Sequence, residues 1–93
     1  MLEKDIERKL VLKAKKRGCM SVKLVSASFN GLPDRIILSP DGTAAFIELK
    51  APGKKPRPLQ LKRHAQLRAM NFKVYVIDGI EQIEEVLDEI CTS

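Results

Sequence analysis

The apolar residues of the chain recur at helical spacing in three places, which predicts helices over residues 3–17, 59–70 and 80–91. The first helix carries its apolar residues on one stripe, formed by Ile6, Leu10, Val11 and Ala14. Gly18 is a natural end for this helix. Pro58 suits the first turn of the second helix, because its missing N–H is not needed there. The inward face of the third helix is expected to carry Ile80, Ile83, Leu87 and Ile90.

Four shorter apolar runs predict strands, over residues 22–28, 34–39, 43–50 and 73–77. The segments 30–33 and 40–42 are rich in turn residues, which favours antiparallel hairpins between the first three strands. The third and fourth strands are joined through the second helix, which predicts a parallel, right-handed crossover. The expected fold is therefore α/β, in the order α-β-β-β-α-β-α, with a mixed sheet flanked by helices in one domain over residues 1–93.

Charge is divided unequally along the chain. All 17 lysines and arginines lie before residue 78 together with six acids, a local net charge of +11, whereas the remainder has six acids and no base, a net charge of −6. This division predicts a positive face for a polyanion and an acidic helix on the far side. An ordinary solvated basic surface explains the charge alone equally well.

The sequence indicates a cytoplasmic protein of a bacterial or phage-infected cell. The opening residues MLEKDIERKL alternate charges and do not form the apolar part of a secretion signal. No apolar run approaches the ~20 residues that cross a bilayer, so no membrane contact is expected. Cys19 and Cys91 form no CxxC motif, and we expect both to be reduced thiols.

The third predicted strand holds two charged residues where strands rarely carry them, in the stretch FIELK. Glu48 and Lys50 point to the same face of the sheet, because side chains alternate along a strand. Asp34 opens the neighbouring antiparallel strand and is expected opposite Glu48, within cross-strand reach. Two carboxylates this close repel unless a proton or a cation lies between them. Hard oxygen ligands favour Mg²⁺ or Mn²⁺, and one histidine without a close cysteine pair gives no zinc set.

These residues resemble a known nuclease signature. Pro33-Asp34 followed by Glu48-Leu49-Lys50 is similar to the PD-(D/E)XK motif of restriction-endonuclease-like nucleases. The wider pattern of GLPDRIIL, FIELKAPG, PLQ and KVYVID resembles the VRR-NUC family over residues 3–87, essentially the whole chain. That family includes the nuclease domain of the Fanconi-anaemia-associated structure-specific nuclease and small standalone phage and bacterial proteins. Asn71 stands where the family often has Gly, but Asn also serves as a helix cap.

The resemblance implies a restriction-endonuclease-like core and a metal site. Asp34, Glu48 and the carbonyl of Leu49 would hold Mg²⁺, for which Mn²⁺ would substitute. Lys50 would orient the attacking water and stabilise the charge on the phosphate.

Two further site residues follow from matching motif positions. Gln60 opens the second helix on its inward arc and would position water or phosphate. Glu7 lies within the apolar arc of the first helix, where an unpaired carboxylate is costly, and would complete the metal site. Glu3 lies in the same arc one turn earlier and is the alternative to Glu7.

The remaining polar residues have weaker signals. Lys54, Lys55 and Arg57 lie in a proline-rich loop just beyond Lys50 and are expected to contact DNA phosphates. His64 is the sole histidine, and a lone histidine on a helix is usually a surface or packing residue. Arg35 is expected to point away from the site by alternation, and its partner stays open.

The expected activity is that of a Mg²⁺-dependent endodeoxyribonuclease acting on branched DNA. The standalone relatives imply a homodimer that resolves four-way (Holliday) junctions, and a two-fold dimer supplies the two sites that paired nicks require. Cleavage of flaps, nicking or restriction-like cleavage of duplex DNA is the alternative within nucleases. A non-catalytic nucleic-acid-binding module is the alternative outside them, and the intact set of acids and lysine argues against it.

Overall fold

A computed structural model describes residues 1–91 of the chain, and its elements follow the predicted order. The described elements are α1 (Glu3–Lys16), β1 (Met20–Lys23), β2 (Arg35–Leu38), β3 (Ala44–Leu49), α2 (Pro58–Ala69), β4 (Lys73–Ile77), a 3₁₀ turn η1 (Ile80–Gln82) and α3 (Ile83–Ile90). The predicted third helix is thus divided into a 3₁₀ turn and an α-helix. The order α-β-β-β-α-β-α is confirmed.

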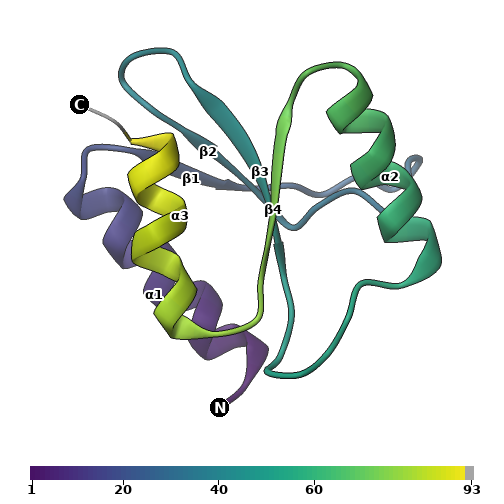
Figure 1. Ribbon diagram of the computed structural model, residues 1–93, viewed down its shortest axis with the longest axis horizontal. Coiled ribbons are helices and arrows are strands. Elements are labelled where there is room, and N and C mark those ends of the chain that lie inside the picture. Colours follow the sequence, from purple (N-terminus) through teal and green to yellow (C-terminus); the bar gives the residue numbers. More distant parts are fainter. Residues whose placement is uncertain (92–93) are drawn as a thin grey trace.

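The strands form one mixed sheet in the order β1-β2-β3-β4. β1 and β3 both pair antiparallel with β2, and β3 pairs parallel with β4 through α2, as predicted. The helices α1 and α3 lie side by side on one face of this sheet, and α2 lies on the other (Figure 1). Helices on both faces and the mixed sheet are those that the sequence predicts.

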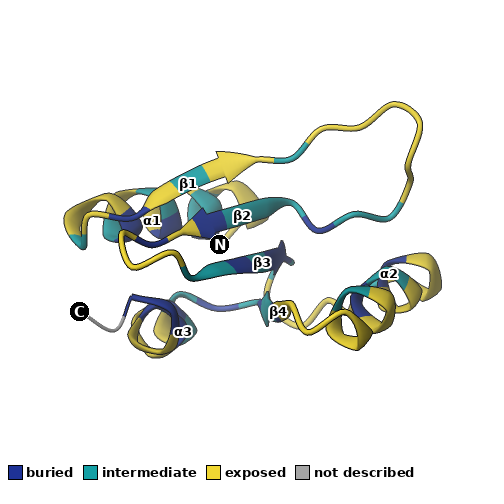
Figure 2. Ribbon diagram, turned by 90° about the horizontal axis from the view of Figure 1, so that it is seen from above, coloured by how far each residue is buried: buried dark blue, intermediate teal, exposed yellow. Residues whose placement is uncertain are grey.

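The hydrophobic core lies between the sheet and the pair α1 and α3. In β3 the alternate residues Ala45, Ile47 and Leu49 are buried in this core. They pack with the inward stripes of the two helices, which include Ile6, Leu10, Ala14, Ile83, Leu87 and Ile90. Figure 2 shows the buried residues concentrated on β3 and on the facing sides of these helices. Because side chains alternate, the intervening residues of β3, Glu48 among them, face α2 instead.

The first strand differs from its prediction. It was expected over residues 22–28, but β1 spans Met20–Lys23, and its register pairs Met20 with Leu38 and Lys23 with Arg35. Leu24 still donates its N–H to the carbonyl of Asp34, and the following residues leave the sheet as a long loop (Figure 2). The hydroxyl of Ser26 accepts the N–H of Phe29, so local side-chain bonding competes with the strand.

Two helix ends depend on residues with left-handed backbone. Gly18 follows α1 with a φ of 76°, which a glycine adopts without steric cost. Asn71 follows α2 with a φ of 70°, and its N–H donates to the carbonyl of Arg68. Asn71 therefore serves as the helix cap that the sequence predicts for it.

The two cysteines do not behave as predicted. A disulfide joins Cys19, which lies between α1 and β1, to Cys91, which directly follows α3, and both residues are buried. The expectation of two reduced thiols is wrong, because the packing of α1 beside α3 brings together residues that are 72 positions apart. None of the described helices is both long and apolar enough to cross a membrane.

Candidate active site

The two predicted carboxylates meet at one end of the sheet. The register pairs Arg35 of β2 with Ile47 of β3, so one further step along both strands places Asp34 opposite Glu48. Asp34 Oδ2 accepts the N–H of Leu49 at 2.7 Å, which ties the residue before β2 to the end of β3. The predicted proximity of Asp34 and Glu48 is therefore present in the structure.

Glu48 is fully buried, and α2 supplies hydrogen-bond partners to both of its oxygens. Gln60 Nε2 lies 3.2 Å from Oε2, and His64 Nε2 lies 2.9 Å from Oε1. These two partners are one helical turn apart and themselves buried. The face of α2 that meets β3 is thus polar, and it is directed at one carboxylate.

The pKa of Glu48 is strongly shifted by its surroundings. The pKa of Glu48 is raised from 4.5 to about 8, chiefly by burial and then by the hydrogen bond and negative charge of Asp34, while the ammonium of Lys50 acts in the opposite direction. A carboxylate in this position is shifted toward its neutral form unless positive charge approaches it. The pair Asp34 and Glu48 therefore favours either a shared proton or a cation.

Lys50 and the three residues expected to contact DNA lie just past this end of β3. Lys50 is half-buried and donates its backbone N–H to the carbonyl of Ile77 in β4, so the chain is fixed at this position. Lys54, Lys55 and Arg57 are exposed in the loop before α2. Their side chains are available to an anion that approaches Asp34 and Glu48.

The acids of α1, Glu3 and Glu7, do not form hydrogen bonds with Asp34 or Glu48 among the described contacts. Arg35 Nε donates to Glu7 Oε2 at 2.9 Å, and both side chains are partly buried on the α1 face of the sheet. Arg35 thus points away from the site, as alternation predicts, and gives Glu7 the partner that its place in an apolar arc requires. The negative charge of Glu3 is the one from α1 that raises the pKa of Glu48. Metal binding by Glu7 stays a prediction.

His64 is the residue whose contribution the sequence least suggests. It is 1% exposed, and it contacts Glu48 directly. Burial lowers the pKa of His64, and the charge of Arg68 lowers it further, so the imidazole is held toward its neutral form. The signal that could have identified it is its spacing of four residues from Gln60, which puts both on one face of a helix.

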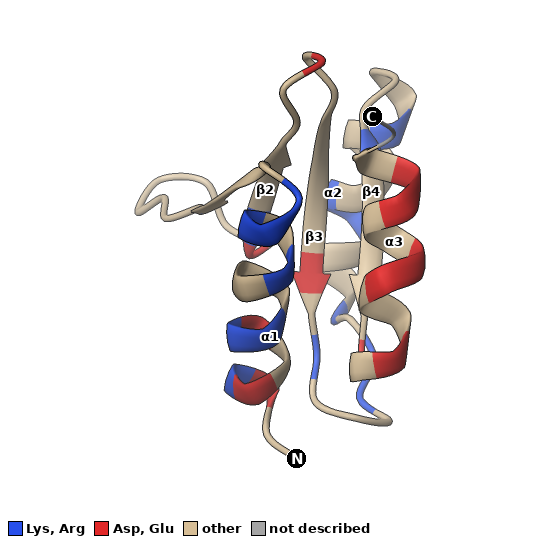
Figure 3. Ribbon diagram, turned by 90° about the vertical axis from the view of Figure 1, so that its left-hand side faces the viewer, with Lys and Arg blue, Asp and Glu red and all other residues tan. Residues whose placement is uncertain are grey.

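The charged surface is only partly divided as predicted. Figure 3 shows basic residues along α1 and in the loop after β3, and acids along α3. However, α3 lies beside α1, where Lys13 and Arg17 pair with Glu84, and Arg17 also pairs with Asp88. The prediction that the acidic helix lies on the far side from the basic residues is therefore wrong for the last turns of α1, because both helices cover the same face of the sheet.

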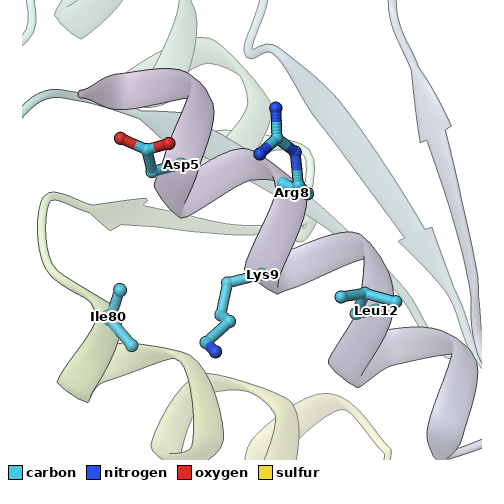
Figure 4. Close-up of a pocket in the computed structure, with 5 residues that line it drawn as sticks. All are labelled: Asp5, Arg8, Lys9, Leu12 and Ile80. Atoms are coloured by element: carbon cyan, nitrogen blue, oxygen red, sulfur yellow. The ribbon is translucent and has the colours of Figure 1, made fainter. Parts of the chain in front are cut away.

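Two surface pockets lie beside α1. One, of about 250 Å³, is lined by Asp5, Arg8, Lys9 and Leu12 of α1 and by Ile80 across from them (Figure 4). It includes none of the predicted site residues. The other, of about 420 Å³, includes Glu7 and Arg35. Neither contains the buried carboxylate pair.

Comparisons with known proteins agree with this fold. No family model matches the chain. A protein named "Putative nuclease p44", from Acyrthosiphon pisum secondary endosymbiont phage 1, is 45% identical over 77 residues, which are 83% of this chain and 83% of that protein. A solved structure described as a VRR_NUC domain has a TM-score of 0.86 at 25% identity, and covers 92% of this chain and 94% of the solved chain. The predicted restriction-endonuclease-like fold is confirmed, and the chain belongs to the VRR-NUC nuclease family.

Proposed function

We propose that this nuclease is a Mg²⁺-dependent endonuclease that hydrolyses phosphodiester bonds in DNA. The observation that carries the proposal is the buried Glu48 beside Asp34, with its pKa raised to about 8. Two neighbouring acids in this state are unfavourable for the fold, and a divalent cation held by Asp34 and Glu48 would offset their repulsion. Lys50 and the basic loop then supply positive charge on the side from which a phosphate approaches.

The donor set fits Mg²⁺ or Mn²⁺ better than zinc. Among the described residues, no three or more His, Cys, Asp or Glu side chains come together as metal ligands. The ligands that we propose are the carboxylates of Asp34 and Glu48 and the backbone carbonyl of Leu49. Mg²⁺ is commonly held by one or two carboxylates and keeps several waters, whereas a structural zinc takes four nitrogen or sulfur ligands. When bound, the ion would lower the pKa of a water and offset charge on the scissile phosphate.

The side chains around Asp34 and Glu48 would have separate roles in binding and cleaving the DNA. Lys50 has a compact ammonium that can donate to a phosphate oxygen and stabilise the charge that develops there. Gln60 is buried and its amide donates a hydrogen bond to Glu48, so we expect its main role to be orienting that carboxylate. Lys54, Lys55 and Arg57 would bind the DNA backbone on either side of the cleaved bond.

The substrate that we propose is branched DNA, with a four-way junction preferred. Phosphate contacts from lysine and arginine carry no sequence information, and the sequence contains no recognisable DNA-recognition helix or zinc finger. The protein would then select its substrate by the shape of the DNA rather than by its base sequence. A homodimer would place two equivalent sites on two equivalent strands of a junction.

The proposal is tested by cleavage of labelled DNA. Purified protein is incubated with a four-way junction, a flap, duplex and single-stranded DNA, each with Mg²⁺, Mn²⁺ or EDTA. We expect cleavage of the junction with either cation and none in EDTA. Preferred cleavage of the flap would replace junction resolution with flap cleavage, and equal cleavage in EDTA would contradict the metal site. Binding without cleavage of any substrate would leave a nucleic-acid-binding module.

A further inference from the structure

The inner face of α2 is unusual in composition. Of its 12 residues, all of which the structure describes, two are buried, and these are Gln60 and His64 rather than leucines. Leu59, Leu61 and Met70 at the same helix are exposed. Burying polar groups is unfavourable unless they are hydrogen-bonded, and here both partners are the oxygens of Glu48. The face of α2 is therefore built around this carboxylate.

The direction of the hydrogen bond from Gln60 is fixed by the chain before the helix. The N–H of Arg57 donates to Gln60 Oε1 at 2.8 Å, and a backbone N–H can only donate. This orients the amide with its nitrogen toward Glu48. Gln60 Nε2 is then the donor, and Glu48 Oε2 is the acceptor.

The direction of the hydrogen bond from His64 follows from its other nitrogen. His64 Nδ1 is buried and has no hydrogen-bond partner among the described residues. A proton on Nδ1 would be a buried donor without an acceptor, and it would leave the lone pair of Nε2 facing the Glu48 carboxylate. The tautomer with the proton on Nε2 avoids this cost, and it donates to Glu48 Oε1.

We propose that His64 is a positioning residue, which together with Gln60 holds the Glu48 carboxylate in one orientation for its metal. This inference rests on the proposed function. A carboxylate has about four lone-pair sites, so one donor on each oxygen leaves capacity on both for a cation. Partners that orient a metal ligand in this way typically account for about 10–100-fold in metal affinity or activity. At 1% exposure, His64 cannot itself touch DNA.

The test compares three substitutions of one residue. His64→Gln places an amide nitrogen near the position of imidazole Nε2, whereas His64→Asn carries the same amide one methylene shorter and does not reach it. His64→Leu removes the donor and keeps the volume. Mn²⁺ affinity of the DNA-free protein is measured by calorimetry, and kcat and KM are measured on the cleaved DNA. Circular dichroism confirms that each variant is folded.

We expect His64→Leu and His64→Asn to weaken Mn²⁺ binding about tenfold or more and to lower kcat with KM for DNA unchanged, and His64→Gln to restore most of both. Should His64→Leu fail to fold, the Gln and Asn pair carries the comparison alone. Equal Mn²⁺ affinity in wild type and all variants, or equal loss in Gln and Asn, would overturn the positioning role. If wild type itself bound no Mn²⁺, the proposed metal site would be wrong, and this inference would fall with it.

Discussion

The crowded acid pair predicts that replacing Asp34 by asparagine stabilises the metal-free protein at alkaline pH. The Asp34→Asn side chain would keep an oxygen for the N–H of Leu49, which Asp34 Oδ2 accepts at 2.7 Å in the wild type, and would remove one of two neighbouring negative charges. The pKa of Glu48 is raised from 4.5 to about 8, so between these values the folded protein holds a proton that the unfolded chain has lost. Stability therefore falls as pH rises through this window, and it is lowest above about pH 8.

The magnitude follows from the size of the pKa change. A rise from 4.5 to about 8, at about 1.4 kcal/mol for each tenfold change in acidity, is worth on the order of 5 kcal/mol. Burial is the largest cause and Asp34 the second, so removing the Asp34 charge should recover about 1–2 kcal/mol of that loss. For a domain of this length, this corresponds to a rise in Tm of about 5–10 °C.

The assay is thermal melting in EDTA at about pH 5 and about pH 9, for wild type, Asp34→Asn and a control. Asp41→Asn is the matched control, because Asp41 Oδ1 also accepts a backbone N–H, that of Thr43, in the turn at the opposite end of the β2–β3 hairpin. We expect Asp34→Asn to melt higher than wild type at alkaline pH and close to it at acid pH. A gain of the same size at both values, or a loss at alkaline pH, would refute the repulsion between Asp34 and Glu48.

The other predictions concern chemistry and assembly. Asp34→Ala and Glu48→Ala should abolish cleavage while DNA binding in EDTA, followed by gel shift, is kept or strengthened, and residual cleavage by either variant would contradict the metal assignment. Lys50→Ala should lower kcat by about a hundredfold or more, as loss of one transition-state donor does, and a loss under about threefold would reject that role. Light scattering at micromolar concentration should give about twice the chain mass of 10.4 kDa, with paired nicks in a cruciform plasmid. A species of single-chain mass that yields nicked circles alone would contradict the dimer and leave the nuclease chemistry untouched.

The carboxylate end of the sheet could be predicted from the sequence because local rules determine it. Strand alternation placed Glu48 and Lys50 on one face, and the tight turn at 40–42 fixed the register that brings Asp34 opposite Glu48. Alternation also placed Arg35 away from the site. Each of these inferences uses residues within one hairpin, where turn length and the period of two leave few alternatives.

The contacts made across the domain could not be predicted in this way. The pairing of Glu7 with Arg35, the disulfide between Cys19 and Cys91, and the contact of His64 with Glu48 all join separate elements. Helical periodicity places a residue on a face, but it does not identify what that face meets. The prediction for His64 therefore relied on how lone helical histidines usually behave, and the position of α2 over Glu48 makes this residue an exception.

The way in which α2 is held to the sheet links the stability of the fold to the chemistry of the site. His64 and Gln60 contact Glu48, while Arg68 donates to the carbonyl of Val74 at 2.8 Å and Arg63 donates to that of Asn30 at 2.8 Å. Four polar side chains of α2 thus bind the rest of the domain, and removing Glu48 leaves two buried donors without an acceptor. Glu48→Ala therefore perturbs both the metal site and the packing of α2.

The substitution Glu48→Gln separates these two effects, because it keeps one acceptor oxygen and nearly the same volume. A loss of cleavage in both variants is then due to the missing carboxylate. A loss of Tm in Glu48→Ala alone is due to the packing of the helix.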